Sequence, residues 1–174
     1  FEIDDEQTDN YLSAVPTTGS RPQRRAYELA LFMASTPGSP LYDMIEFQRP
    51  TILGRRRDYK ICVNAVNWVH YVRRWFIRGS IYSDWNSDSW HADEVLNFFK
   101  AFQEVCTLNW PDAPRWVPGR GRTKPLLQFE GPFLSLLEFF PRVVSTMVNE
   151  GLVNRPISKS SFVDELRPLR NVDW

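Results

Sequence analysis

Apolar side chains recur at helical spacing in four stretches of this chain, and clusters of proline and glycine separate the stretches. Positions three and four residues apart share one face of a helix, so each stretch predicts an amphipathic helix with one buried side. No segment alternates apolar and polar residues as a half-buried strand does, and no internal repeat is present. The predicted buried faces are Ala26, Leu29, Ala30 and Met33; Ile61, Ala65, Trp68, Val69, Val72, Trp75 and Phe76; Val95, Leu96, Phe98, Phe99, Phe102 and Val105; and Phe133, Leu136, Leu137, Phe140, Val144, Met147 and Val148.

Capping and helix-breaking residues predict where these helices begin and end. A side-chain oxygen before the first turn accepts a backbone N–H group, and proline fits the first turn. Glycine or proline ends a helix. The expected starts are Ser20 with Pro22, Asp58, and Asp88 or Ser89, and the expected ends are Thr36–Pro40 and Gly79.

The whole pattern predicts a mainly α fold of about five helices, packed as one orthogonal or irregular bundle. The fourth helix is expected to open near Pro125 or Pro132 and to run to Asn149, and a short fifth helix to span Ser161–Arg167. Two long loops that contain Pro, Gly or Trp, at 80–89 and 107–125, are expected between helices. A structureless loop as long as the second is usually functional or mobile.

Composition bounds the class of protein. The chain has 174 residues, of which 43% are apolar and 14% aromatic, and this content is sufficient for a large core. No apolar run approaches the roughly 18 residues that span a bilayer, so no membrane partner is expected. Two cysteines, Cys62 and Cys106, do not make a disulfide framework, and we expect Cys106 in the core. A cytoplasmic location is the corresponding expectation.

Charge divides the chain into two parts. Five acidic residues lie within the first ten positions, with no basic residue before Arg21. From residue 21 onward there are 21 basic and 16 acidic residues, a net charge of +5. We therefore interpret residues 1–20 as an acidic segment or connector and residues 21–174 as a single helical domain. Because the first residue is Phe1 rather than Met, we expect a fragment of a longer protein, whose upstream part or a partner chain completes it.

Seventeen of the 21 basic residues are arginine, and they occur in clusters. Arginine grips phosphate through two parallel N–H groups and stacks on flat rings. Two interpretations stay open: a surface that binds nucleic-acid phosphates, or ordinary solvated faces of a protein whose GC-rich gene encodes arginine instead of lysine. The clusters are Arg21, Arg24 and Arg25; Arg55, Arg56 and Arg57 with Lys60; Arg73, Arg74 and Arg78; and Arg115, Arg120, Arg122 and Lys124.

The loop at 107–125 is the best single candidate for a contact surface. Its segment Gly119–Lys124 (Gly-Arg-Gly-Arg-Thr-Lys) has the composition of a phosphate-binding loop but lacks the Walker spacing. Trp110 and Trp116 flank the segment and either stack on bases or pin the loop onto the helices. The cluster Arg55–Arg57 precedes a predicted helix start that attracts phosphate, although Asp58 competes for the same N–H donors.

No catalytic or metal-binding motif stands out in the sequence. His91 lies near Asp93 and Glu94, but the helix dipole explains acidic residues at a helix start, and neighbouring residues alone do not make convergent ligands. His70 and Cys62 lie two helical turns apart, which is too far for a direct hydrogen bond. We therefore expect no catalytic residue, no metal site and no cofactor in this chain.

Three stretches taken in order resemble the C-terminal helical part of the DGQHR-domain family, which includes the DndB-type proteins linked to DNA phosphorothioation. They are Arg25–Ile45, then Val95–Phe102 leading to Asn109–Pro111, and finally Leu126–Leu137. The family has a Ser-Pro-Phe-Tyr turn, for which this chain has Ser-Pro-Leu-Tyr at 39–42. The defining Asp-Gly-Gln-His-Arg motif is absent from the 174 residues, so no motif residue carries over. The resemblance implies a bacterial DNA-modification or antiviral defence context, with a DNA-associated role such as transcription regulation.

The leading hypothesis is therefore a non-catalytic, DNA-associated regulatory or accessory protein. It would bind the nucleic-acid backbone through its arginine clusters, including the 115–124 loop. One alternative is a structural or assembly module of a viral shell or a homo-oligomer, whose interfaces use Trp, Phe and Arg. A second alternative is part of an enzyme whose active site lies upstream.

Overall fold

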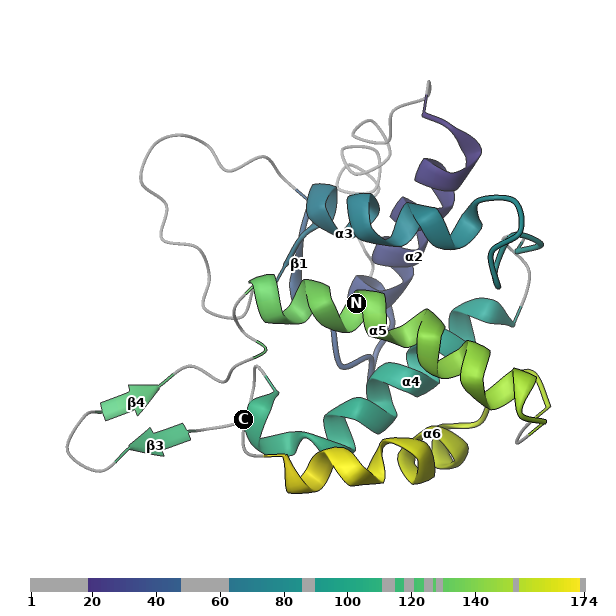
Figure 1. The fold of residues 1–174 in the computed structure, drawn as a ribbon. Helices are drawn as coiled ribbons and strands as arrows, with labels where there is room; N and C mark the ends of the chain where they lie inside the picture. Colours follow the sequence, from purple (N-terminus) through teal and green to yellow (C-terminus); the bar gives the residue numbers. More distant parts are fainter. Residues whose placement is uncertain are drawn as a thin grey trace, which may run out of the picture.

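The computed structural model describes residues 19–47, 63–85, 90–110, 115–117, 121–123, 127, 130–151 and 154–172. These residues form a mainly α fold with five α-helices, as the apolar periodicity predicts (Figure 1). The helices are α2 (Arg21–Ser35), α3 (Ala65–Val72), α4 (His91–Val105), α5 (Glu130–Asn149) and α6 (Lys159–Leu166). Short 3-10 helices follow three of them: η1 (Arg73–Phe76), η2 (Thr107–Asn109) and η4 (Arg167–Asn171). Most of the predicted acidic segment, residues 1–18, lies outside the described residues.

Helix α2 forms where the sequence predicts it. Its predicted core face, Ala26, Leu29, Ala30 and Met33, is at most 2% exposed. Ser20 occupies the N-cap position, but its side chain makes no capping hydrogen bond, so that part of the prediction is wrong. Thr36 leaves the helix in an extended conformation, and Gly38 follows with a φ of +78°, a left-handed conformation that glycine adopts without strain.

The second helix begins six residues later than the Asp58 cap predicts. Its N-cap is Asn64, whose side-chain oxygen accepts the Val66 amide at 2.8 Å. Before the helix, β2 (Val63–Asn64) pairs in parallel with β1 (Ile45–Glu46). Two residues per strand are too few to show an alternating pattern, which is why the sequence does not reveal this ladder.

The end of the second helix agrees with the prediction. Helix α3 tightens into η1, and Ile77 then leaves the helix in an extended conformation. Gly79 follows with a φ of +84°, the left-handed geometry expected of it.

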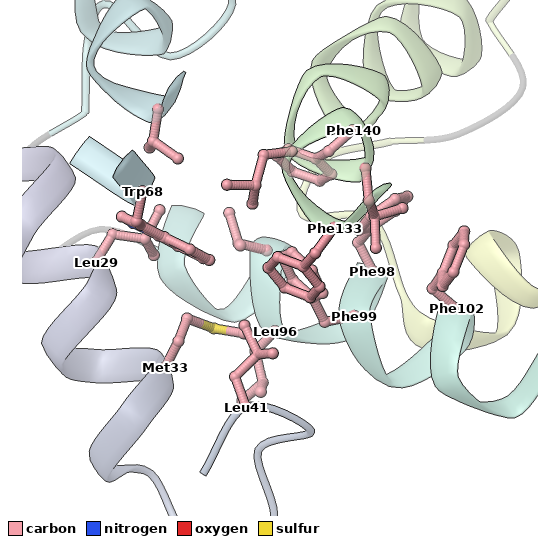
Figure 2. Close-up of a cluster of buried hydrophobic side chains, with 14 of the residues drawn as sticks. Leu29, Met33, Leu41, Trp68, Leu96, Phe98, Phe99, Phe102, Phe133 and Phe140 are labelled. Atoms are coloured by element: carbon pink, nitrogen blue, oxygen red, sulfur yellow. The ribbon is translucent and has the colours of Figure 1, made fainter. Parts of the chain in front are cut away.

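The core lies where α4 and α5 meet α2 and α3. Figure 2 shows Leu29 and Met33 of α2 and Trp68 of α3 pointing toward the phenylalanines of α4 and α5. The ring centroids of Phe98 and Phe140 are 4.8 Å apart, a separation at which aromatic pairs attract beyond simple burial. The predicted core faces of α4 and α5 are confirmed, with every residue buried except Val148, which is half-buried.

Both predicted long loops contain more structure than the sequence indicates. Within 107–125, β3 (Arg115–Val117) and β4 (Gly121–Thr123) form an antiparallel pair. The 80–89 loop places Tyr82 and Trp85 in the core, 0% and 5% exposed. Burying two large aromatic rings stabilises the fold, and this gain in free energy determines the path of the segment despite its polar neighbours.

The last helix lies along α4. Ser158 caps α6 by accepting the Ser161 amide at 3.2 Å. Phe162 is fully buried, with its ring 5.5 Å from that of Phe98. In the view of Figure 1, α5 and α4 lie between α3 and α6, so η1 and η4 occupy different sides of the molecule. No helix among the described residues is both long and apolar enough to span a bilayer.

Candidate nucleic-acid interface

Three predicted contact residues lie exposed where α3 ends. Arg73 and Arg74 belong to η1, and Arg78 follows in the next turn. Among the residues that the structure describes, no carboxylate forms an ion pair with Arg73 or Arg78. The helix dipole also favours cations at this place, so their position has a structural as well as a functional explanation.

The segment that carries these arginines is fixed against α5. Glu130 accepts hydrogen bonds from the Asn64 amide at 3.1 Å and from the Asn67 side chain at 2.8 Å. About two helical turns further along α5, Arg74 donates to Glu138. The α3–η1 unit and α5 therefore run side by side in the same direction, as Figure 1 also shows.

The other predicted contact residues are described in part or not at all. Arg55, Arg56, Arg57, Arg120 and Lys124 lie outside the described residues. Arg115 and Trp116 belong to β3 and Arg122 to β4, where the ladder pairs Trp116 with Arg122 and Arg115 with Thr123. The structure thus adds a backbone register to the loop, and its contact role stays a prediction.

Trp110 is not available to stack on a base. Its side chain is 1% exposed, and its indole N–H donates to the Pro40 carbonyl at 3.3 Å. The ring packs near Phe102 and Phe133. The alternative interpretation, in which this tryptophan pins the loop onto the helices, is the one that its burial supports.

The first arginine cluster, at residues 21–25, has both exposed and buried members. Arg21 and Arg24 are exposed on the first turn of α2, whereas Arg25 is 8% exposed. The Arg25 guanidinium donates to the Ser83 carbonyl at 3.4 Å, and burial lowers its pKa. Arg25 therefore ties α2 to the segment after η1.

A buried acidic residue that the sequence did not single out organises the same region. Glu94 is 0% exposed and accepts the Tyr82 hydroxyl at 2.6 Å. Its carboxylate also accepts Arg155 Nη2 at 2.9 Å and the Ile157 amide at 2.9 Å. Glu94 does lie in the first turn of α4, as predicted, but the sequence did not indicate that its carboxylate is fully desolvated and satisfied by these groups.

The same contacts shift the pKa values of two partners of Glu94, Tyr82 and Arg155. Burial, reinforced by the charge of Glu94, raises the pKa of Tyr82 well above its ordinary value. Burial lowers the pKa of Arg155, but the hydrogen bond and charge of Glu94 outweigh it, so the net shift is upward. The Arg155 guanidinium also lies over the rings of Tyr82 at 4.9 Å and Trp90 at 4.7 Å.

His91 lies inside the aromatic part of this region. It is 3% exposed, and its ring stacks on Trp85 at 5.1 Å and lies 4.1 Å from Trp90. Asp84 Oδ1 is 3.7 Å from its Nε2. Burial lowers the pKa of His91, with the charge of Asp84 opposing and that of Arg155 reinforcing the shift. His91 is thus the first residue of α4, where the sequence predicts a helix start, and its ring is buried.

The spacing of residues along α4 could have indicated that Glu94 is buried. Glu94 precedes Phe98 by four residues and Phe102 by eight, so it shares their core-facing side. Tyr82 and Arg155 are far from it in sequence, and no spacing rule connects them.

No group of three or more His, Cys, Asp or Glu residues within the described residues is arranged to hold a metal ion. Cys106 is buried, as predicted, and burial raises the pKa of its thiol to about 11, which suppresses its reactivity. The guanidinium groups of Arg73, Arg74 and Arg78 are exposed and are therefore able to contact a ligand.

The chain matches no protein-family model, and it has no significant match among curated proteins or solved structures. The resemblance to the DGQHR-domain family therefore stays a prediction.

Proposed function

We propose that this chain is the helical part of a DNA-associated regulatory or accessory protein that binds the nucleic-acid backbone through arginine. The observation that carries the proposal is the exposed set Arg73, Arg74 and Arg78 at the end of the α3–η1 unit, held against α5. The bacterial DNA-modification or defence context rests on the family resemblance alone.

The arrangement of these arginines suits contact with phosphates better than recognition of bases. The exposed guanidinium groups come from a 3-10 helix and the turn after it, where no long helix is free to enter a major groove. Contacts of this kind fix position on the backbone and carry little sequence information. Binding is therefore expected to be strongly dependent on salt and weakly dependent on sequence.

The assembly alternative ranks second, because most of the aromatic side chains that it would use at an interface are buried. Four of the five tryptophans whose side chains the structure describes are in the core, and most of the described phenylalanines are there too. An interface built on Trp and Phe would need these rings at the surface.

The test is fluorescence anisotropy of a labelled duplex with salt titrated at fixed protein concentration. The double variant Arg73→Glu/Arg78→Glu is expected to bind more weakly to every duplex sequence. Two lost phosphate contacts reduce the steepness of the log–log salt slope by about 2. Arg74 is left intact in this variant because it also pairs with Glu138.

The matched control is Arg167→Glu/Arg170→Glu, which makes the same change of charge on η4. These two arginines are also exposed but lie on a different side of the molecule. The control is expected to keep the wild-type slope. Equal loss in both double variants would show that only net charge matters, and no binding by the wild-type chain at low salt would refute the proposal.

A further inference from the structure

The exposed face of the α3–η1 unit combines positive charge with apolar surface. Val66, His70 and Arg73 recur at spacings of four and three residues on this face, and Ile77 follows at the end of η1. Val66 is 68% and Ile77 52% exposed, the two highest values among the large apolar side chains of the described residues. A partner that carries both acidic and apolar residues would complement this face.

The protein's own carboxylates compensate this positive charge only in part. Within the described residues, Glu138 is the one carboxylate paired with the arginines of η1, and it pairs with Arg74. Arg73 and Arg78 are exposed beside that pair. Arg142 is also exposed, one helical turn beyond Glu138 on α5. Four exposed guanidinium groups therefore share a single carboxylate, and the face is left with a net positive charge.

The first ten residues of the chain carry the opposite charge. They contain no basic residue and five acidic ones, with Phe1 and Ile3 among them; the acidic residues are Glu2, Asp4, Asp5, Glu6 and Asp9. Residues 11–20 are uncharged, so the charge of −5 at residues 1–10 balances the +5 of the rest of the chain. A second copy of this chain would bring the same basic face and be repelled, whereas residues 1–10 match the face in charge and in apolar content.

The structure fixes the start of α2, to which these residues lead, close to the α3–η1 unit. The Trp68 indole N–H of α3 donates to the Ala26 carbonyl at 3.0 Å. In the second turn of α2, Arg25 donates to the Ser83 carbonyl at 3.4 Å. Ser83 follows Arg78 by only five residues, which span at most about 18 Å. The first turns of α2 therefore lie near the end of η1.

The chain between residues 1–10 and α2 is long enough to reach this face. Residues 11–20 span at most about 35 Å when extended, more than the separation that the Arg25 contact leaves between the start of α2 and Arg78. A binding segment joined to its target by a linker of this length has an effective concentration in the millimolar range. Even weak ion pairs are therefore sufficient to keep the face occupied.

We infer that residues 1–10 dock on the exposed face of the α3–η1 unit and mask Arg73 and Arg78 from nucleic-acid phosphates. The docking follows from the charges and the tether, and the masking rests on the proposed function. The carboxylates pair with the same guanidinium groups that phosphates would use. A duplex has to displace the acidic residues, so competition within the chain lowers the affinity for DNA.

The first experiment measures docking without DNA, in the full-length chain. The neutralised chain carries Glu2→Gln, Asp4→Asn, Asp5→Asn, Glu6→Gln and Asp9→Asn. A fluorescein-labelled peptide of residues 1–12 is expected to bind this chain at low salt, as followed by anisotropy. It should bind the wild type about threefold to about 30-fold more weakly, because the wild-type segment competes for the face. A peptide with the same five substitutions should bind neither chain.

Further variants of the neutralised chain locate the docking surface. Arg73→Glu/Arg78→Glu should weaken peptide binding by about tenfold or more. Arg167→Glu/Arg170→Glu makes the same change of charge on η4 and should leave peptide binding unchanged. Ile77→Ser should weaken binding without changing its salt dependence, because it removes an apolar contact and no charge.

The second experiment measures masking with the labelled duplex. Asp4→Asn/Asp5→Asn is expected to tighten duplex binding about twofold to about tenfold at low salt, and the gain should vanish in high salt. Glu150→Gln/Glu165→Gln is the matched control, because it removes the same charge from exposed positions just after α5 and on α6. An equal gain in the two double variants would overturn the masking, since net charge alone would then explain it.

The outcomes separate this inference from the proposed function. If the peptide fails to bind the neutralised chain, or binds equally well whichever arginine pair is reversed, the docking is overturned while duplex binding by the wild type keeps the proposed function. If the peptide binds as expected but no form of the chain binds duplex, the proposed function fails and the masking fails with it, whereas the docking of residues 1–10 stands.

Discussion

Two Arg–Glu pairs in this protein have the same chemistry and opposite surroundings. Glu94 and Arg155 meet where the carboxylate is 0% and the arginine side chain 20% exposed. Glu138 and Arg74 meet on the surface of α5 and η1, 39% and 51% exposed. The first pair holds distant segments together, and the second lies where a ligand can reach it.

The difference shows that the surroundings of an arginine, rather than its sequence cluster, decide its role. Removing a partner from a buried pair leaves an uncompensated charge without water, whereas a surface charge regains its hydration. Arg155 belongs to none of the sequence clusters, yet its guanidinium donates to Glu94 and to the Ile81 carbonyl and so joins segments far apart in the sequence. Arg25 is the buried member of a cluster whose other two members are exposed.

The largest effect is expected from Glu94→Ala. This change leaves Arg155, the Tyr82 hydroxyl and the Ile157 amide without their common acceptor, so we expect a loss of about 3–5 kcal/mol in the free energy of unfolding. Urea denaturation followed by circular dichroism measures it. Glu138→Ala is the matched control, and equal losses in the two variants would remove the distinction between the pairs.

An intermediate effect is expected from the protonation of His91. Because burial lowers its pKa, the unfolded chain binds the proton first as the pH falls, and the folded state is destabilised. This contribution to stability is complete above the ordinary pKa of about 6.5 and is lost between that value and the lower folded pKa. The slope from this one group is at most about 1.4 kcal/mol per pH unit.

Urea denaturation at a series of pH values checks this expectation. His91→Phe keeps an aromatic ring between Trp85 and Trp90 but cannot titrate, so its stability should fall less steeply below neutral pH. His70→Gln is the control, because it removes an exposed histidine of α3 and leaves the buried His91 in place. A profile unchanged by His91→Phe would exclude His91 as the titrating group.

The smallest effect is expected from the surface pair. In a double-mutant cycle of Arg74→Ala and Glu138→Ala, the coupling energy should stay below about 1 kcal/mol, since both side chains remain hydrated when separated. The coupling should shrink further in high salt. A coupling as large as the loss expected for Glu94→Ala would contradict the comparison between the two pairs.

The local sequence pattern was sufficient to predict the helices and most of their core faces. The periodicity of Ala26–Met33 and of Val95–Val105 identifies α2 and α4 because burial of one helix face dominates their packing. The start of α3 was predicted wrongly at Asp58, since the β1–β2 ladder that precedes Asn64 pairs residues far apart in the sequence. The hairpin β3–β4 was not predicted either, because three residues per strand contain too little pattern.

The candidate site was predictable only in part. The exposure of Arg73, Arg74 and Arg78 agrees with a charged helix end, and the burial of Trp110 supports one of the two roles that the sequence left open for it. Composition identifies which side chains are able to stack or bind phosphate. Which of them reach solvent depends on packing among α2, α4 and the segment after η1.

The sequence by itself determined the mainly α class, the helix faces that form the core and the presence of many guanidinium groups, because these depend on spacing along one chain. Only the tertiary structure decided which charges are buried and which are exposed. Glu94, Tyr82 and Arg155 become one network because three separate segments converge on a carboxylate that has lost its water and must find donors within the protein.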